Sequence, residues 1–180
     1  MKKRIEVKML SEDLITDRYL NWFNDESVIE FSGGGKKNLT KKSVLDYMQT
    51  GIDTGRYYMW GIFMKENNLH IGNIKVGEID LKNNISDLAT IIGDVNYWGK
   101  GLATEAIIVG QELAFEKYNF RKLSGTILAG NLGSLKAYKR AGWVEEGLLK
   151  DHIKVGDKLH DQILVSRFNP KLYSKGPNGQ

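Results

Sequence analysis

The stretch Asn96-Tyr97-Trp98-Gly99-Lys100-Gly101-Leu102-Ala103-Thr104-Glu105 decides how this chain is interpreted. It follows the apolar run Leu88 to Val95 and precedes residues with helical periodicity, so it predicts a strand, a glycine loop and a helix. Glycine permits the positive φ angles that such a loop needs. The start of a helix directs free amide groups and the positive end of its dipole at an anion. The stretch therefore predicts a binding site for a diphosphate.

Two common nucleotide motifs do not match this loop. It has no Gly-Lys-Ser/Thr ending, and Thr104 stands where a dinucleotide fingerprint has its third glycine. A pair of glycines after a strand is by itself more often a tight turn than a ligand site. The residues that follow must therefore decide between the two interpretations.

Those residues predict a second helix with a polar stripe. The first helix runs from Ala103 to about Tyr118, a strand covers Lys122 to Ala129, and a short helix opens at Gly130-Asn131 and stops at Gly142. Spacings of three, four and seven residues place side chains on one helix face. The stripe comprises Asn131, Ser134 and Tyr138. Its structural alternative is an Asn131 cap beside a half-buried tyrosine.

Taken together, these motifs resemble the GNAT superfamily of acyl-CoA N-acyltransferases. The motifs are "YWGKGLATEAI", "NLGSLKAYKRAGWVEEG" and "HDQILVSRF", in the order and spacing of that family. The resemblance covers essentially the whole chain and is strongest from Ile91 to Phe168. Asn96 replaces the usual Arg or Gln, as in the branch that resembles ribosomal-protein N-terminal acetyltransferases and amino-sugar N-acyltransferases.

The resemblance implies acetyl-CoA or another acyl-CoA as cofactor, with coenzyme A as product. It also implies that the strand around Gly93 to Val95 splays from its neighbour, and that Tyr138 protonates the departing thiolate. The cofactor-binding residues that it implies are Val95, Trp98, Gly99, Lys100, Gly101, Leu102, Ala103, Thr104, Asn131 and Ser134.

The general base is less well defined by the sequence. Glu78 and Asp94 are candidate carboxylates, and His152 is a candidate histidine, with His160 as the other histidine of the C-terminal half. A carboxylate or a lone histidine is more often a surface residue. The family also uses water chains without a single base.

The front half resembles the substrate side of enzymes that acylate nucleotide-linked amino sugars. The predicted substrate-binding residues are Trp22, Gly34, Lys36, Lys37 and Asp161. The lysines can meet a diphosphate and the aromatic residues a base or sugar, although Tyr58 and Trp60 fit a core role better. We expect an N-acyltransferase acting on a nucleotide-linked deoxyamino sugar of surface-polysaccharide biosynthesis. The alternatives are N-terminal acetylation of a ribosomal protein or peptide, and a non-catalytic acyl-CoA-binding module.

Composition favours one globular unit. The chain has 180 residues, 41% of them hydrophobic, a net charge of +4 and no cysteine. The missing cysteines exclude disulfides and thiolate metal sites, and no other metal site is predicted. The basic residues are scattered, so we expect no nucleic-acid partner, and no span reaches membrane length. We expect a cytoplasmic protein, with a homodimer as one possible assembly, that has one domain over 1–170 and a loose tail over 171–180.

The predicted fold class is α/β (α+β), with a single mixed, mostly antiparallel sheet flanked by helices. Short turns join the middle strands as an antiparallel meander, and the helical crossover after Val95 makes the next neighbour parallel. The strands are expected at residues 5–10, 57–64, 71–79, 88–95, 122–129, 143–148 and 159–168. Front-half helices are expected at residues 14–23 and from a Thr40 cap through Met48.

Overall fold

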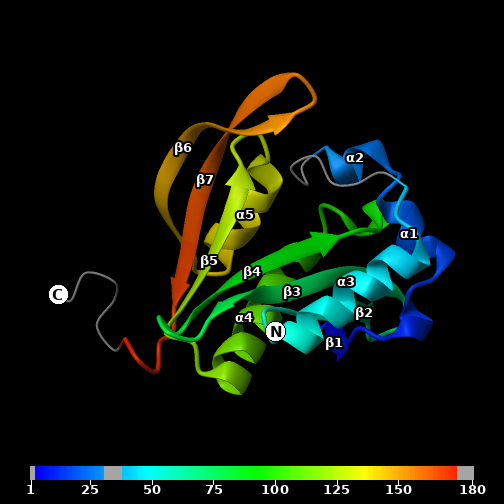
Figure 1. Ribbon diagram of the computed structural model, residues 1–180, viewed down its shortest axis with the longest axis horizontal. Coiled ribbons are helices and arrows are strands. Elements are labelled where there is room, and N and C mark those ends of the chain that lie inside the picture. Colours follow the sequence, from blue (N-terminus) through cyan, green and yellow to red (C-terminus); the bar gives the residue numbers. More distant parts are fainter. Residues whose placement is uncertain (1–2, 31–37, 174–180) are drawn as a thin grey trace.

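The computed structural model describes residues 3–30 and 38–173, which form one seven-stranded sheet (Figure 1). The strands are β1 (Ile5–Met9), β2 (Tyr58–Met64), β3 (His70–Asp80), β4 (Ile85–Ile92), β5 (Lys122–Leu128), β6 (Val144–Val155) and β7 (Lys158–Phe168). The α-helices are α1 (Asp17–Trp22), α2 (Glu26–Ile29), α3 (Lys41–Thr54), α4 (Leu102–Tyr118) and α5 (Leu132–Arg140). Short 3-10 helices cover Glu12–Leu14 and Val95–Tyr97.

The sheet is mixed and mostly antiparallel, as the sequence predicted. Its order is β1-β2-β3-β4-β5-β7-β6, and β4 and β5 form its parallel pair. That pair has only three rungs, which end at Asp87 opposite Ser124. Beyond them the strands diverge, and Figure 1 shows β4 and β5 opening as a V. The helical crossover α4 connects the two strands, as expected for parallel neighbours.

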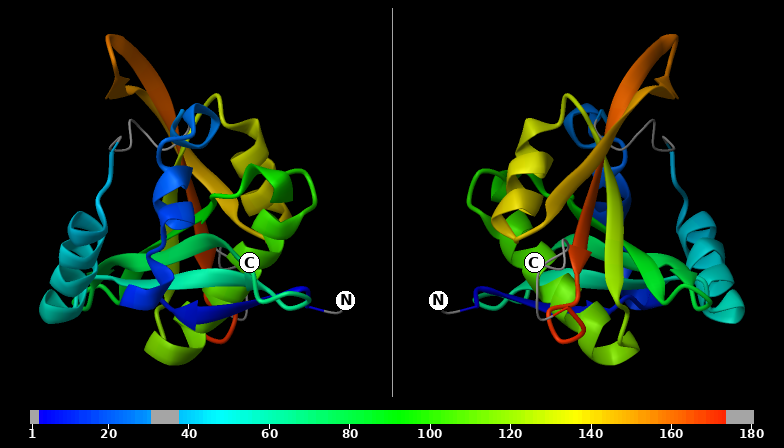
Figure 2. Two further views of the ribbon diagram at one scale, coloured as in Figure 1. Left: turned by 90° about the vertical axis from the view of Figure 1, so that its right-hand side faces the viewer. Right: turned by 90° about the vertical axis from the view of Figure 1, so that its left-hand side faces the viewer.

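Helices cover both faces of the sheet. Figure 2 shows α3 on one side and α4 with α5 on the other. Helix α4 lies very close to the strands at Gly110, where an added Cβ would lie 3.1 Å from Ile74 and 3.3 Å from Leu88. This close packing holds the middle of α4 against β3 and β4. No helix in the described residues combines the length and apolarity needed to cross a membrane.

Two predicted boundaries differ for reasons of local hydrogen bonding. The helix expected at residues 14–23 is divided, because the Thr16 side chain caps α1 by accepting from Tyr19 N. The strand expected to reach Val95 ends at Ile92, because Asp94 caps a 3-10 turn.

Two further predictions concern the helix that begins after Thr40 and the C-terminal tail. The Thr40 cap is confirmed as a capping box with Ser43, but α3 continues past Met48 to Thr54. Most of the predicted tail, residues 174–180, lies outside the described residues.

The buried side chain of Gln111 connects α4 to the segment after α5. Its Oε1 accepts from Trp143 Nε1 at 2.8 Å, and its Nε2 donates to Ala141 O at 3.4 Å. Trp143 in turn packs edge-on against Tyr138 with ring centroids 4.9 Å apart. Gln111 therefore helps to fix the helix that carries Tyr138.

We expect Gln111→Leu to lower the free energy of unfolding by about 1–3 kcal/mol, since the buried indole N–H loses its acceptor. Urea denaturation measures the change. The control is Gln49→Leu, which removes an exposed amide hydrogen-bonded to Asp53 and should be nearly neutral. Equal stabilities of the two variants would show that the buried contact contributes nothing.

Candidate active site

The parting of β4 and β5 leaves backbone groups of β4 without a strand partner. The first is Leu88 O, which accepts a hydrogen bond from the Tyr138 hydroxyl at 2.9 Å. On its other side, β4 pairs with β3. The contact with β3 continues past the end of β4, because Gly93 N and Asp94 N donate to Ile71 O of β3 at 2.9 and 3.1 Å. The parting therefore begins at Leu88, earlier than the predicted position around Gly93 to Val95.

Tyr138 reaches this parting from α5. It is 5% exposed, and burial raises its pKa to about 12, with a smaller contribution from the charge of Asp87. The hydroxyl and amide of Thr90 oppose this rise. The phenol is therefore protonated at neutral pH and can donate a proton.

Thr90 is the next polar residue along β4. Its Oγ1 is buried and has no hydrogen-bond partner in the described part of the chain, although it lies near enough to Tyr138 to influence its pKa. A hydroxyl in this position can bind a polar group of a ligand. Leu88 O, Thr90 and Tyr138 thus converge between the diverging strands.

The glycine loop has the geometry that the sequence predicted. Gly99 and Gly101 have φ angles of 72° and 75°, and Gly101 is the N-cap of α4. As a glycine, Gly101 has no side chain with which to cap this helix. The amides of residues 102–104 have no acceptor among the described residues, so they are free to bind an anion.

The other predicted loop residues differ in exposure and contacts. Trp98 is 40% exposed and donates from Nε1 to Ile92 O at 2.7 Å, and Lys100 Nζ lies 5.3 Å from the Tyr97 ring centroid. Leu102 is buried in the core, so only its backbone can contact a ligand, whereas Val95 is 38% exposed. Their cofactor-binding role, and that of Ala103 and Thr104 in the first turn of α4, stays a prediction.

The start of α5 presents the predicted polar stripe. Asn131 is the N-cap, and its Oδ1 accepts from Ser134 N at 2.9 Å. Both residues are partly exposed and lie on the helix face that also carries Tyr138. The structure shows the capping role of Asn131, and the cofactor role stays a prediction.

Two of the candidate bases, Asp94 and Glu78, are engaged in ion pairs. The Asp94 carboxylate forms an ion pair with Arg18 and accepts from Asn96 N and Nδ2, both at 3.0 Å. Glu78 forms an exposed ion pair with Arg56 at 2.8 Å. Both carboxylates are thus bound to other groups, which weakens their case as bases.

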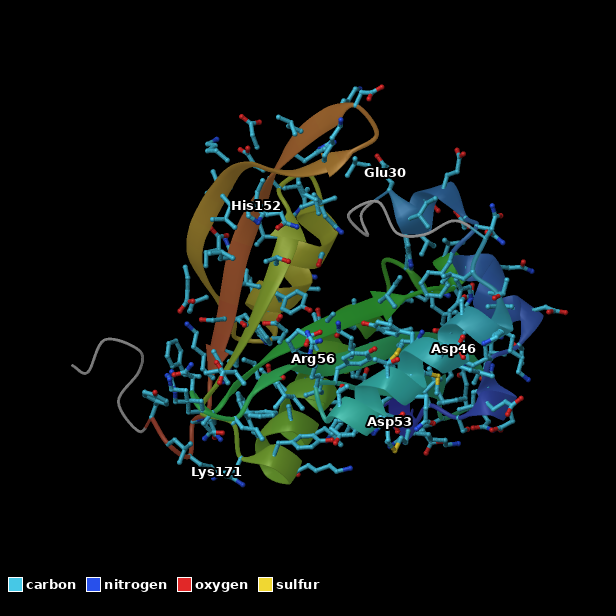
Figure 3. The ribbon with its side chains drawn as sticks, viewed as in Figure 1. Glu30, Asp46, Asp53, Arg56, His152 and Lys171 are labelled. Carbon is cyan, nitrogen blue, oxygen red and sulfur yellow. The ribbon has the colours of Figure 1, made fainter. Side chains whose placement is uncertain are left out.

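His152 lies elsewhere. It is exposed on β6, and Figure 3 shows it on the β6–β7 hairpin. Arg56, the partner of Glu78, lies apart from it near the end of α3. A surface position on a hairpin is the structural alternative that the sequence offered.

The predicted substrate residues are also separated. Trp22 is 6% exposed, and its ring packs against Tyr19, His70 and the backbone of Gly93, so no face is free to stack on a base or sugar. A core role was the alternative for these aromatic residues. It also holds for Trp60, which is 4% exposed.

Asp161 orders the neighbouring hairpin. It binds Lys150 Nζ at 2.8 Å and accepts from Asp151 N at 2.9 Å, and the first of these contacts is the main cause of its lowered pKa. The remaining predicted substrate residues, Gly34, Lys36 and Lys37, lie outside the described residues.

Asp87 is a functional candidate that the sequence analysis did not identify. It is exposed on the last parallel rung, accepts a hydrogen bond from Ser124 Oγ and has no ion-pair partner within residues 3–30 and 38–173. Its charge also contributes to the raised pKa of Tyr138. Nothing in its local sequence marks it, because its position depends on where β5 stops pairing.

No group of three or more His, Asp or Glu residues that could hold a metal occurs in the part of the chain that the structure describes. The polar groups at the parting are instead a phenol, a hydroxyl, a carboxylate and backbone atoms. These groups suit acyl transfer between organic substrates.

Among solved structures, a spermidine N-acetyltransferase from Vibrio cholerae, solved with CoA and spermine, superposes with a TM-score of 0.82 and 17% identity over 93% of this chain and 97% of its own. The ribosomal-protein-S5-alanine acetyltransferase from Vibrio fischeri gives a TM-score of 0.75 at 17% identity over 94% and 95%. At these identities the likeness establishes the fold.

Sequence comparison finds related chains in bacilli. The probable N-acetyltransferase YjcK of Bacillus subtilis (strain 168) is 24% identical over 130 residues, which cover 72% of this chain and 71% of that protein. The uncharacterized N-acetyltransferase p20 of Bacillus licheniformis is 29% identical over 112 residues. That match spans 62% of each protein, less than two thirds of the relative's length.

The family model of the acetyltransferase (GNAT) domain matches residues 4–144, which include the parted strands, the glycine loop and α5. The chain therefore belongs to the GNAT acetyltransferase family and is an acyl-CoA-dependent N-acyltransferase that uses acetyl-CoA.

Proposed function

We propose that this protein transfers an acetyl group to a primary amine that binds beside Asp87, where β4 and β5 part. The observation that carries the proposal is that Asp87 and Tyr138 both lie where β4 and β5 part. One is an exposed carboxylate without an ion-pair partner in the described chain, and the other is a buried proton donor. N-acyl transfer needs groups with these two properties.

The chemistry follows from these two groups. Acetyl-CoA supplies the acyl group as a reactive thioester. The Asp87 carboxylate attracts the ammonium form of the acceptor and then accepts one of its protons as a general base, so that the neutral nitrogen can form the new C–N bond. The C–S bond then breaks, and Tyr138 provides the proton for the thiolate. The free amides at residues 102–104 hold the diphosphate of the donor.

We expect Asp87→Asn to lower kcat/KM for the amine by about 10- to 100-fold, while the Kd for acetyl-CoA changes little. The asparagine side chain can still accept a hydrogen bond from Ser124, so the structure where β4 and β5 part is kept. Steady-state kinetics with varied amine, together with calorimetric titration of the donor, separate the two constants. Asp53→Asn, an exposed carboxylate on α3, is the control. Unchanged amine kinetics in Asp87→Asn would remove Asp87 from the site.

The finer proposal is that the amine belongs to a nucleotide-linked deoxyamino sugar. Its support is the front-half sequence, where Lys36 and Lys37 could meet a diphosphate. Cytoplasmic location, a role in surface-polysaccharide biosynthesis and a homodimer belong to the same proposal.

Other acceptors have support from the solved structures. The superposed proteins are named for spermidine and for alanine of ribosomal protein S5. The carboxylate of Asp87, which has no ion-pair partner in the described chain, would attract a polyamine, because a polyamine carries several positive charges. A protein N-terminus would need room for a peptide chain.

One panel assay distinguishes these acceptors. The purified chain and acetyl-CoA are incubated with nucleotide-linked amino sugars, spermidine and a ribosomal-protein N-terminal peptide, and release of free thiol is followed. Turnover of the sugar nucleotides alone would support the finer proposal. Turnover of only spermidine or the peptide would replace it, and binding of acetyl-CoA without any turnover would support a non-catalytic module.

A further inference from the structure

Glu105 is an acidic residue in the helix turn that receives the diphosphate. It belongs to the first turn of α4, four residues after Gly101, and its side chain is 12% exposed. A carboxylate there interacts favourably with the helix dipole but repels an anionic ligand at the same helix end. Its charge must therefore be compensated if the loop is to bind a diphosphate well.

The chain at the start of β1 supplies that compensation. Arg4 Nε donates to Glu105 Oε2 at 3.0 Å, and the backbone amides of Arg4 and Ile5 donate to Oε1 at 2.5 and 3.3 Å. These bonds draw the carboxylate toward β1. A carboxylate held by a guanidinium and two amides has most of its charge neutralised locally.

The same guanidinium also contacts the glycine loop. Arg4 Nη1 donates to Lys100 O at 3.0 Å, between the two left-handed glycines. An added Cβ at Gly101 would lie 3.8 Å from Arg4 Nη2, so the guanidinium lies against the loop. One side chain directly before β1 thus connects the loop to the first turn of the helix.

We propose that Arg4 is a positioning residue for the diphosphate of acetyl-CoA. It holds the Lys100 carbonyl so that the loop keeps its anion-binding conformation, and it neutralises Glu105 beside the bound phosphates. The inference rests on the cofactor site proposed above and adds a residue that lies about 100 positions earlier in the sequence. An arginine is required, because its planar fork reaches the carboxylate and the carbonyl together.

The chain contains a matched control. Lys3 precedes Arg4 and forms an ion pair with Glu112 on the same helix, at 2.9 Å. Glu112 lies farther along α4, seven residues after Glu105. Lys3→Ala therefore removes the same charge and the same kind of contact between the same elements, but away from the loop.

The test compares Arg4→Ala, Arg4→Lys and Lys3→Ala in the full chain. Calorimetric titration with CoA should give a Kd about tenfold higher for Arg4→Ala, a smaller rise for Arg4→Lys and no change for Lys3→Ala. At saturating acetyl-CoA, kcat should be unchanged. Turnover of acetyl-pantetheine, which lacks the diphosphate, should be the same in all three variants and the wild type.

Two results would overturn the inference. One is a wild-type Kd for CoA in folded Arg4→Ala or Arg4→Lys. The other is an equal loss of activity with acetyl-pantetheine, because this would indicate general damage to the fold. Failure of the cofactor site itself is distinguishable, since replacing Gly101 with Val would then leave the Kd for CoA unchanged.

Discussion

Tyr138→Phe should lower kcat by roughly 10- to 1000-fold and leave the Kd for acetyl-CoA within about twofold of the wild type. The reason is that only the hydroxyl is lost. The ring keeps its edge-on contact with Trp143, and the hydroxyl is needed chiefly when the thiolate leaves. Because the pKa of Tyr138 is raised to about 12, its proton is present throughout the neutral range. Rapid-mixing kinetics at saturating substrates measure the effect on the chemical step.

Tyr118→Phe is the matched control for this variant. Burial raises the pKa of Tyr118 to about 12 as well, but its ring stacks on Tyr58 at the far end of α4. The same chemical change should therefore leave kcat unaltered. If Tyr138→Phe behaved like Tyr118→Phe, the hydroxyl would have only the structural role of binding Leu88 O. A rise in the Kd for acetyl-CoA without a fall in kcat would assign it to cofactor positioning.

The sequence predicted the glycine loop and the polar face of α5 because local rules determine them. Gly99 and Gly101 do have left-handed backbones, and Asn131, Ser134 and Tyr138 share a helix face, since these features depend on residues a few positions apart. The mixed sheet followed from connection lengths. Trp60 packed in the core, as alternation along a strand suggested.

The residues that the sequence could not place depend on contacts between distant segments. Asp94 is a residue type that can act as a base. Its ion-pair partner Arg18 is 76 positions away in the sequence, so no local pattern reveals the pair. Glu78 is engaged by Arg56 from the preceding helix–strand connection. Asp87 became a candidate only because β5 stops pairing after Ser124, which no local pattern reveals. Local patterns therefore predicted the glycine loop, whereas the position of Asp87 required the tertiary structure.

The loop itself provides the second strong test. Replacing Gly101 with Val should raise the Kd for CoA by about 10- to 100-fold, because a β-branched residue disfavours the φ of 75° from which the free amides of α4 point outward. Space does not cause the effect, since the atom nearest to an added Cβ is Arg4 Nη2 at 3.8 Å. The loop should relax toward negative φ and displace the amides of residues 102–104. Calorimetric titration with CoA measures the loss.

Gly55→Val separates this local effect from a general loss of stability. Gly55 ends α3 with a φ of 65°, and an added Cβ there meets no atom within 4 Å, so valine introduces the same backbone strain in the same open space. Both variants should lose about 1–2 kcal/mol of folding free energy. Only Gly101→Val should bind CoA weakly, because only its backbone conformation places amides at the diphosphate. A folded Gly101→Val that bound CoA as tightly as Gly55→Val would move the diphosphate site away from this loop, and with it the role inferred for Arg4.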